Sequence, residues 1–158
     1  MYRPIFRAAC NRRMAGLGAA MLCLPCILAG AAMAADLPQV TIDSTAVTLH
    51  LGGRPVGRYR YAEVPFKPYL QELRTPSGIN ILRDAPFDHL HHHSLMFAVA
   101  VEGVNFWEEK DGFGKQEHLA IRDVFAGHAG GLPCASFKEE VAWRAGGKGL
   151  LHETRAVR

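Results

Sequence analysis

Short runs in which apolar and polar residues alternate, separated by turn-forming residues, constrain the fold of this chain more than any other feature. Turn signals recur about every eight to fifteen residues from residue 45 onward, and Gly52-Gly53 and Thr75-Pro76-Ser77-Gly78 are two of them. A Gly-Gly pair suits the tight turn of a β-hairpin, and side chains along a strand point alternately to its two faces. After residue 34 no segment has the 3.6-residue period of an amphipathic helix. The sequence therefore predicts an all-β fold, an antiparallel β-sandwich.

The spacing of the turn signals also places the strands. We expect them at residues 45–51, 54–61, 69–73, 79–82, 95–101, 104–107, 118–125, 135–143 and 150–157. Residues 95–101 are the most apolar of these runs, which is typical of a strand buried on both faces. The last expected strand reaches the final residues without a closing turn, so we expect the sandwich to be incomplete at its C-terminus.

The first 34 residues have the three parts of a cleavable signal peptide. Four arginines precede an apolar run at residues 14–31, and Ala32-Met33-Ala34 is a small-x-small cleavage signal. Glycine, proline and alanine dilute this run, which is near the lower limit for a bilayer span of ~17–20 residues. We therefore expect a signal peptide at 1–34, a single domain at 35–158 in the periplasm or outside the cell, and no integral membrane span after cleavage. Sec export is favoured, and Arg12-Arg13 leaves twin-arginine export open.

Cleavage changes the charge and the cysteine content. The whole chain has 18 basic and 15 acidic side chains, and the four leader arginines leave 14 basic against 15 acidic, a formal charge of −1. A weakly acidic domain gives no support for nucleic acid as a partner. Three of the four cysteines also lie in the leader, so Cys134 alone remains and no internal disulfide can form.

Four of the eight histidines crowd into residues 88–93, Asp-His-Leu-His-His-His. If this segment is extended, alternation places His89, His91 and His93 on one face. Neutral imidazoles two residues apart on a strand can converge on one ion, and zinc, iron and copper all accept them. Histidines also line saccharide pockets as hydrogen-bonding groups without any metal. A metal site, a metal-free ligand pocket and a purely structural role all remain open at this point, and so does the cofactor.

A tryptophan and two acids follow in the segment Asn105-Phe106-Trp107-Glu108-Glu109. A tryptophan beside carboxylates is typical of a saccharide platform, because the aromatic face stacks on a sugar ring while polar groups bind its hydroxyls. Paired carboxylates also suit general acid and base catalysis. The alternative is a core tryptophan followed by solvated acids. Lys67, Arg74 and His118 are weaker candidates.

Four segments resemble, in order and spacing, one family of secreted bacterial proteins. They are Pro68-Tyr69, Thr75-Pro76-Ser77-Gly78, Asp88-His89-x-His91-His92 and Val104-Asn105-Phe106-Trp107-Glu108-Glu109. On these residues the chain resembles the PmoA-like family, whose members are often labelled methane oxygenase PmoA, from about Pro55 to the last residue. It departs from the family at Leu90, where proline is usual, at His93, and at Ser94, where glycine is usual.

The resemblance implies a sandwich similar to that of galactose mutarotase and a carbohydrate-related role, because the family occurs in polysaccharide-degrading hosts. It also implies an N-terminal portion of a longer protein, since members usually continue past this endpoint. It does not imply methane oxidation. The membrane subunit of methane monooxygenase is an integral helical protein, and residues 35–158 contain no apolar run long enough to span a bilayer.

Three hypotheses remain for an exported β-sandwich. In the first, the protein binds or acts on a saccharide or another small-molecule ligand. The catalytic residues would then be His91, His92, Glu108 and Glu109, and the ligand-binding residues Asp88, His89, Asn105 and Trp107. In the second, His89, His91 and His93 bind zinc, iron or copper for oxidative or hydrolytic chemistry. The third is a non-catalytic binding module of the cell envelope.

Overall fold

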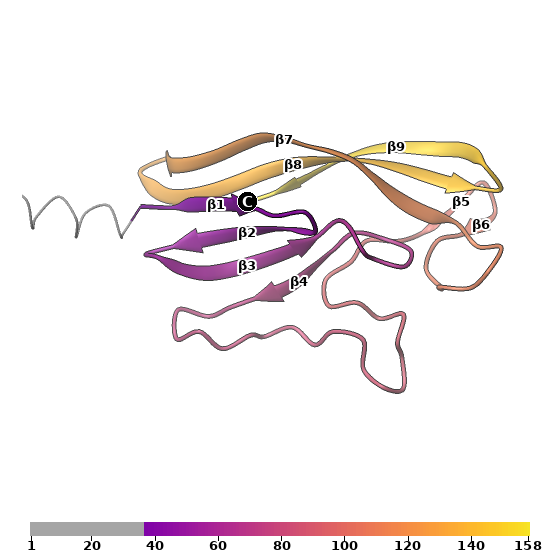
Figure 1. The fold of residues 1–158 in the computed structure, drawn as a ribbon, viewed down its shortest axis with the longest axis horizontal. Coiled ribbons are helices and arrows are strands. Elements are labelled where there is room, and N and C mark those ends of the chain that lie inside the picture. The colour runs from indigo at the N-terminus through magenta and orange to yellow at the C-terminus, as the bar shows by residue number, and fades with distance from the viewer. Residues whose placement is uncertain (1–36) are drawn as a thin grey trace, which may run out of the picture.

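Two antiparallel sheets and a short hairpin make up the computed structural model, which describes residues 37–158 (Figure 1). The expected signal peptide, residues 1–34, lies outside the described residues. Residues 37–158 form strands and no helix, so the predicted all-β, antiparallel fold is confirmed. None of these residues belongs to a helix that could cross a membrane.

Nine strands follow one another along the described residues. They are β1 (Gln39–Ile42), β2 (Ala46–Leu51), β3 (Arg54–Arg60), β4 (Tyr69–Leu73), β5 (Ala100–Val101), β6 (Val104–Asn105), β7 (Lys115–Ala129), β8 (Leu132–Ala145) and β9 (Lys148–Val157). Strands β1 to β4 form a four-stranded sheet in that order, β5 and β6 form a hairpin, and β7 to β9 form a three-stranded sheet. Gly52 and Gly53 join β2 to β3 with φ of 56° and 70°, a left-handed conformation that glycine adopts without strain.

The two larger sheets stack face to face, and the main core lies between them. Val47, Leu49 and Tyr59 of the first sheet pack with Ala135 and Phe137 of β8. In Figure 1 the three long strands lie over the four-stranded sheet. This packing is that of the expected sandwich, while its similarity to galactose mutarotase stays a prediction.

Strand β8 presents one buried face along most of its length. Ala135, Phe137, Glu139, Val141 and Trp143 alternate onto this face, and all five are buried. Val141 and Trp143 belong to a second apolar cluster, which packs against the β5–β6 hairpin. Glu139 is therefore an acid placed between two apolar clusters.

Two expected strands are wrong. Residues 79–82 contain one isolated bridge and no strand, and only Ala100–Val101 of residues 95–101 forms one. The expected burial on both faces is wrong as well, since three large side chains of that run are 43–57% exposed, namely Leu95, Phe97 and Val99. An apolar run does not determine which segment will pair with it, and here the run pairs with β4 through an isolated bridge between Leu95 and Leu70. Strand β1, which is short and mostly exposed, was not expected.

Candidate functional site

The histidine-rich segment lies in the long connection between β4 and β5, and it forms turns rather than a strand. The His89 N–H donates to the Pro86 carbonyl (2.8 Å) and the His92 N–H to the His89 carbonyl (2.9 Å). The Ala85 N–H donates to the His92 carbonyl (3.1 Å), which closes the loop. The expected two-residue alternation over residues 88–93 is therefore wrong, because consecutive turns rotate side chains out of that repeat.

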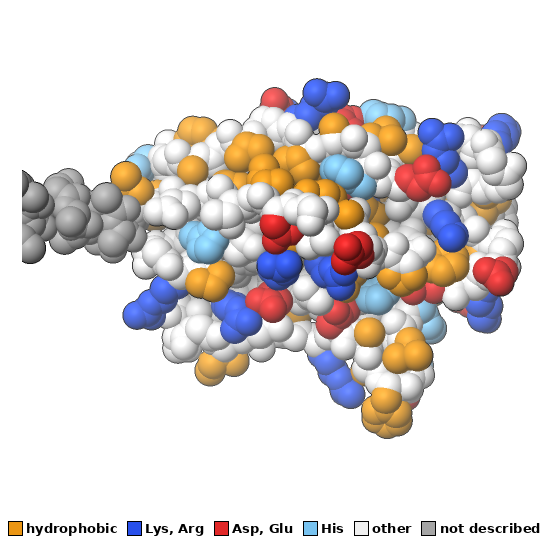
Figure 2. Space-filling view, in the orientation of Figure 1, with side chains coloured by type: hydrophobic (Ala, Val, Ile, Leu, Met, Phe, Trp, Pro, Cys, Tyr) orange, Lys and Arg blue, Asp and Glu red, His pale blue; other side chains and the backbone are white. Residues whose placement is uncertain are grey.

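These turns gather the rings of His89, His91 and His92, a group that we call the histidine trio. The ring centroids are 4.4 Å apart for His91 and His92, 4.7 Å for His89 and His92, and 6.1 Å for His89 and His91. Trp107, which is 43% exposed, meets His92 edge to face at 5.6 Å. Figure 2 shows exposed hydrophobic side chains at the lower tip of the molecule, where part of this connection lies. The structure thus brings three predicted histidines and the predicted tryptophan together from two separate loops.

His93 points the other way, into the protein. It is 7% exposed, and its ring stacks on Tyr69 with the centroids 4.5 Å apart. Its Nδ1 lies 3.1 Å from Asp84 Oδ1 and its Nε2 3.1 Å from Glu109 Oε1. The second distance is that of an ion pair, but no hydrogen bond forms at Nε2. The structure therefore separates His93 from the other two histidines of the predicted metal set, and residues 37–158 contain no group of three or more His, Cys, Asp or Glu arranged to hold a metal ion.

Residues 105–109, which we call the tryptophan turn, begin at the last residue of β6. Asn105 Oδ1 accepts hydrogen bonds from the N–H groups of Trp107 (2.7 Å) and Glu108 (3.2 Å), so this predicted ligand-binding side chain shapes the backbone of the turn. Glu108 forms an ion pair with the exposed Lys110. The hydrogen bond and the charge of that lysine lower the pKa of Glu108, so its carboxylate is ionised at the surface at neutral pH.

Glu109 lies beneath the surface in a group of four charged or titratable side chains, which we call the buried bridge. These are Lys67, Asp84, His93 and Glu109. The Lys67 side chain is completely buried, and its Nζ donates to Glu109 Oε1 (2.7 Å) and to the Trp107 carbonyl (3.0 Å). Asp84 Oδ2 accepts from the Tyr69 hydroxyl (3.0 Å) and from Gln71 Nε2 (3.1 Å). Burial acts to raise the pKa of Asp84, but the hydrogen bonds from Gln71, His93 and Tyr69 outweigh it and lower that pKa.

The surroundings of His92 favour its uncharged ring. Loss of hydration, followed by the neighbouring His91 and His89, lowers the pKa of His92. A neutral imidazole donates one hydrogen bond and accepts another, which suits hydroxyl groups. Asp88 Oδ2 lies 3.2 Å from His89 Nδ1, and a backbone N–H and that histidine lower the pKa of Asp88. Asp88, a predicted ligand-binding residue, is thus paired with a ring of the histidine trio.

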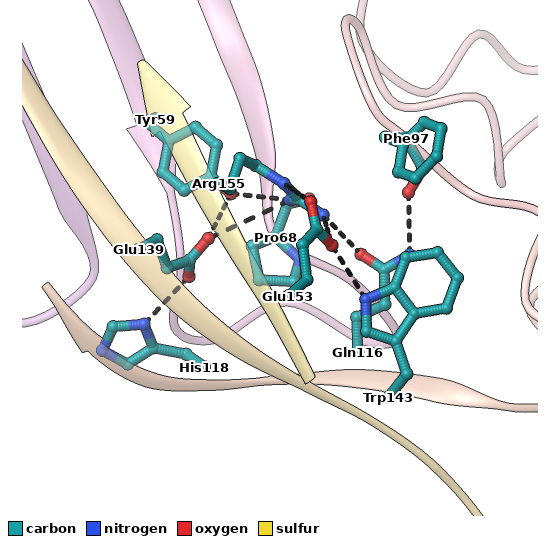
Figure 3. A network of polar contacts seen from close by, with 9 residues as sticks. All are labelled: Tyr59, Pro68, Phe97, Gln116, His118, Glu139, Trp143, Glu153 and Arg155. Atoms are coloured by element: carbon teal, nitrogen blue, oxygen red, sulfur yellow. Dashed lines mark hydrogen bonds and ion pairs between the residues drawn. The ribbon is translucent and has the colours of Figure 1, made fainter. Parts of the chain in front are cut away.

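A separate polar network fills the interior between the sheets (Figure 3). Glu139 accepts a hydrogen bond from the Tyr59 hydroxyl, and its Oε1 lies 2.9 Å from His118 Nδ1. Arg155 donates to the Tyr59 hydroxyl (2.8 Å) and forms an ion pair with Glu153 (2.8 Å). Burial is the main cause that raises the pKa values of both Glu139 and Tyr59. The network ties β3 to β7, β8 and β9, and its groups largely satisfy one another.

Most of this network was not predicted from the sequence, which indicated His118 as a weaker candidate and gave no role to Tyr59 or Arg155. Of the buried bridge, Lys67, His93 and Glu109 were candidates, in other roles, and Asp84 was not. One signal was available: Glu139 shares the alternating face of β8 with large apolar side chains, and an acid in such a position needs partners. No comparable signal exists for Lys67, whose partners lie 40 and 42 residues further along the chain.

Two hollows lie elsewhere on the described part of the chain. A cleft of about 910 Å³ opens between the two larger sheets, with mainly apolar lining from β2, β3, β4 and β8. A smaller hollow of about 270 Å³ lies beside His118. Neither is lined by the histidine trio or the tryptophan turn, so the predicted site lies apart from both of these hollows.

The fold and the geometry define the class of this protein. It is an all-β sandwich that carries a surface group of histidines beside an exposed tryptophan. The chain belongs to DUF6807, a family of unknown function whose family model matches residues 46–158. The match extends from β2 to the end of the chain and includes both loops of the candidate site. Neither the curated proteins nor the solved structures compared with the chain include a match.

Proposed function

We propose that this protein binds a saccharide on the surface formed by the histidine trio and Trp107. The observation that carries the proposal is a 43% exposed indole placed beside three imidazole rings. An indole face stacks on the apolar face of a sugar ring, while neutral imidazoles exchange hydrogen bonds with its hydroxyls.

Turnover at this surface would use Glu108 together with His91 or His92. Glu108 is ionised at neutral pH because its pKa is lowered, chiefly by Lys110. An ionised carboxylate suits a general base or a nucleophile, and an imidazole ring can take up or release the proton that the reaction moves. Binding without turnover is the expectation for a non-catalytic module of the cell envelope.

Two parts of this proposal come from the sequence. Within DUF6807 we place the chain among the PmoA-like secreted proteins, on the motifs that contain Asp88 and Trp107. We also propose export to the periplasm or the cell exterior, on the signal peptide at residues 1–34. Export would bring the site to the compartment in which a bacterium meets polysaccharides. Nucleic acid is not a proposed partner.

The proposal is tested by titration calorimetry of the exported full chain against a panel of oligosaccharides. Trp107→Ala and His92→Ala are each expected to weaken binding about tenfold or more, which corresponds to about 1.4 kcal/mol. Phe125→Ala and His152→Ala are matched controls, because Phe125 is as exposed as Trp107 and His152 is an exposed histidine on another strand. Equal losses in the variants and in the controls would contradict the proposal, as would a panel in which no saccharide binds.

The closeness of three imidazole rings favours a second function, a metal-dependent oxidative or hydrolytic reaction. The predicted ligands His89, His91 and His93 could meet only if His93 left its position between two carboxylates. The metal content of the exported protein beside His91→Ala separates the two functions. Near-stoichiometric zinc, iron or copper that His91→Ala loses would support the metal-dependent reaction. Absence of metal from both proteins after metal-replete growth would leave the saccharide proposal alone.

A further inference from the structure

The buried bridge lies directly under the proposed saccharide surface and includes the only complete burial of a lysine side chain among residues 37–158. Burial of an ammonium group is costly unless it is paired and hydrogen-bonded. Lys67 sits in the irregular link between β3 and β4, and both of its acceptors belong to the tryptophan turn. The buried ammonium group of Lys67 therefore holds the tryptophan turn in place.

The acceptors show which part of the turn is held. One is the carbonyl of Trp107 itself, and the other is the carboxylate of Glu109, two residues further on. The Asn105 side chain holds the N–H of Trp107 from the opposite side of the same turn. The backbone of the exposed tryptophan is thus fixed at both its N–H and its carbonyl, while its indole stays accessible.

The bridge also reaches the histidine loop. One residue separates His93 from His91 of the trio. The His93 ring lies between Asp84 and Glu109, with its Nδ1 3.1 Å from Asp84 Oδ1 and its Nε2 3.1 Å from Glu109 Oε1. Asp84 is anchored to β4 through Tyr69 and Gln71. A continuous chain of polar contacts therefore runs from a strand of the first sheet, through the histidine loop, to the tryptophan turn.

We propose that Lys67 and Glu109 are positioning residues that hold Trp107 at a set place beside the histidine trio. The inference rests on the proposed saccharide function for its consequence, because a pre-positioned aromatic side chain binds a sugar ring with less loss of conformational freedom. It divides the roles of the two adjacent acids. Glu108 is the carboxylate available to a ligand, and Glu109 acts from below through Lys67.

The chain contains two tryptophans, and this makes the position of Trp107 measurable without a ligand. Trp107 is 43% exposed and Trp143 is 0% exposed, so acrylamide quenching of the fluorescence reports chiefly on Trp107. Subtraction of the signal of a Trp107→Phe variant isolates it. Lys67→Met and Glu109→Gln are each expected to make Trp107 more readily quenched and to weaken saccharide binding by roughly three- to tenfold.

The double variant Lys67→Met/Glu109→Gln is expected to lose no more affinity than either single variant, because both changes remove the same link. It also guards against loss of the fold, since replacing both members of a buried ion pair by neutral groups is often tolerated when removal of one is not. The control is the exposed pair of Lys138 on β8 and Asp123 on β7. The double change Lys138→Met/Asp123→Asn should leave the quenching of Trp107 unchanged.

Unchanged quenching of Trp107 in a folded double variant would overturn the inference. The proposed function fails separately. If the wild-type protein binds no saccharide while the variants still release Trp107, the positioning role stands and the saccharide function falls. If saccharide binding depends on Trp107 but the Lys67 and Glu109 variants bind and quench like the wild type, the positioning role alone is wrong.

Discussion

Gly114 is expected to be the least replaceable glycine near the candidate site. A Cβ atom added there would lie 2.3–2.5 Å from three carbons of the Phe106 ring. Phe106 is 1% exposed, and its ring packs against Trp143 with the centroids 4.8 Å apart, so it has no free space to move into. The Gly114 N–H also donates to the Asn105 carbonyl (2.9 Å), which keeps the two segments close.

The cost of Gly114→Ala follows from this geometry. Carbon atoms in contact prefer about 3.5–4.0 Å, so the ring and the new methyl group must separate by roughly 1.2 Å. Overpacking of this kind costs about 1–3 kcal/mol in a packed core. With a urea dependence of about 1–3 kcal/mol per molar, a loss of 2 kcal/mol lowers the denaturation midpoint by roughly 1 M.

The assay is urea denaturation at pH 7, followed by tryptophan fluorescence, with Gly149→Ala as the matched control. Gly149 lies in β9, has no heavy atom within 4 Å of an added Cβ and has no left-handed φ. Its replacement should leave the midpoint unchanged or raise it slightly, because alanine restricts the unfolded chain. If Gly114→Ala unfolds at the same midpoint as Gly149→Ala, the close approach of Phe106 to the backbone is refuted.

Two further predictions concern the interior network. Burial raises the pKa of Glu139 in the folded protein, so protonation of this carboxyl group stabilises the fold. That contribution is complete below about pH 4.5, the ordinary pKa, and is lost as the pH rises through the higher pKa of the folded state. Urea midpoints from pH 4 to 8 should therefore fall for the wild type relative to Glu139→Gln, and a difference that does not change with pH would refute this. Arg155→Met should cost about 3–5 kcal/mol, because it removes the donor to the buried Tyr59 hydroxyl and the cationic partner of Glu153, which keeps Trp143 Nε1 as its donor. A loss below about 1 kcal/mol would show that Glu153 and Tyr59 find other partners.

Much of the fold could be predicted because the responsible forces are local. Alternation and turn residues placed β2, β3, β4 and the three long strands within a few residues of their observed bounds. Glycine pairs such as Gly52-Gly53 ended strands because only glycine adopts a positive φ without strain. Pairing between strands that are far apart in the sequence was harder to predict, as residues 95–101 show. Their apolar character was correct, but the expected burial was not, because burial depends on which segment covers them.

For the candidate site, too, the sequence predicted some features and the tertiary structure decided the others. The sequence by itself determined that histidines, a tryptophan and two acids are available in two short segments, since composition and spacing are properties of the chain. Only the tertiary structure decided that the turns of the histidine loop gather His91 with His89 and His92 while His93 is buried, and that the Glu109 side chain is 11% exposed against 35% for Glu108. The physical reason is the ammonium group of Lys67. It is brought from a distant link into the interior, where the need to pair a buried charge determines which of two adjacent carboxylates turns toward it.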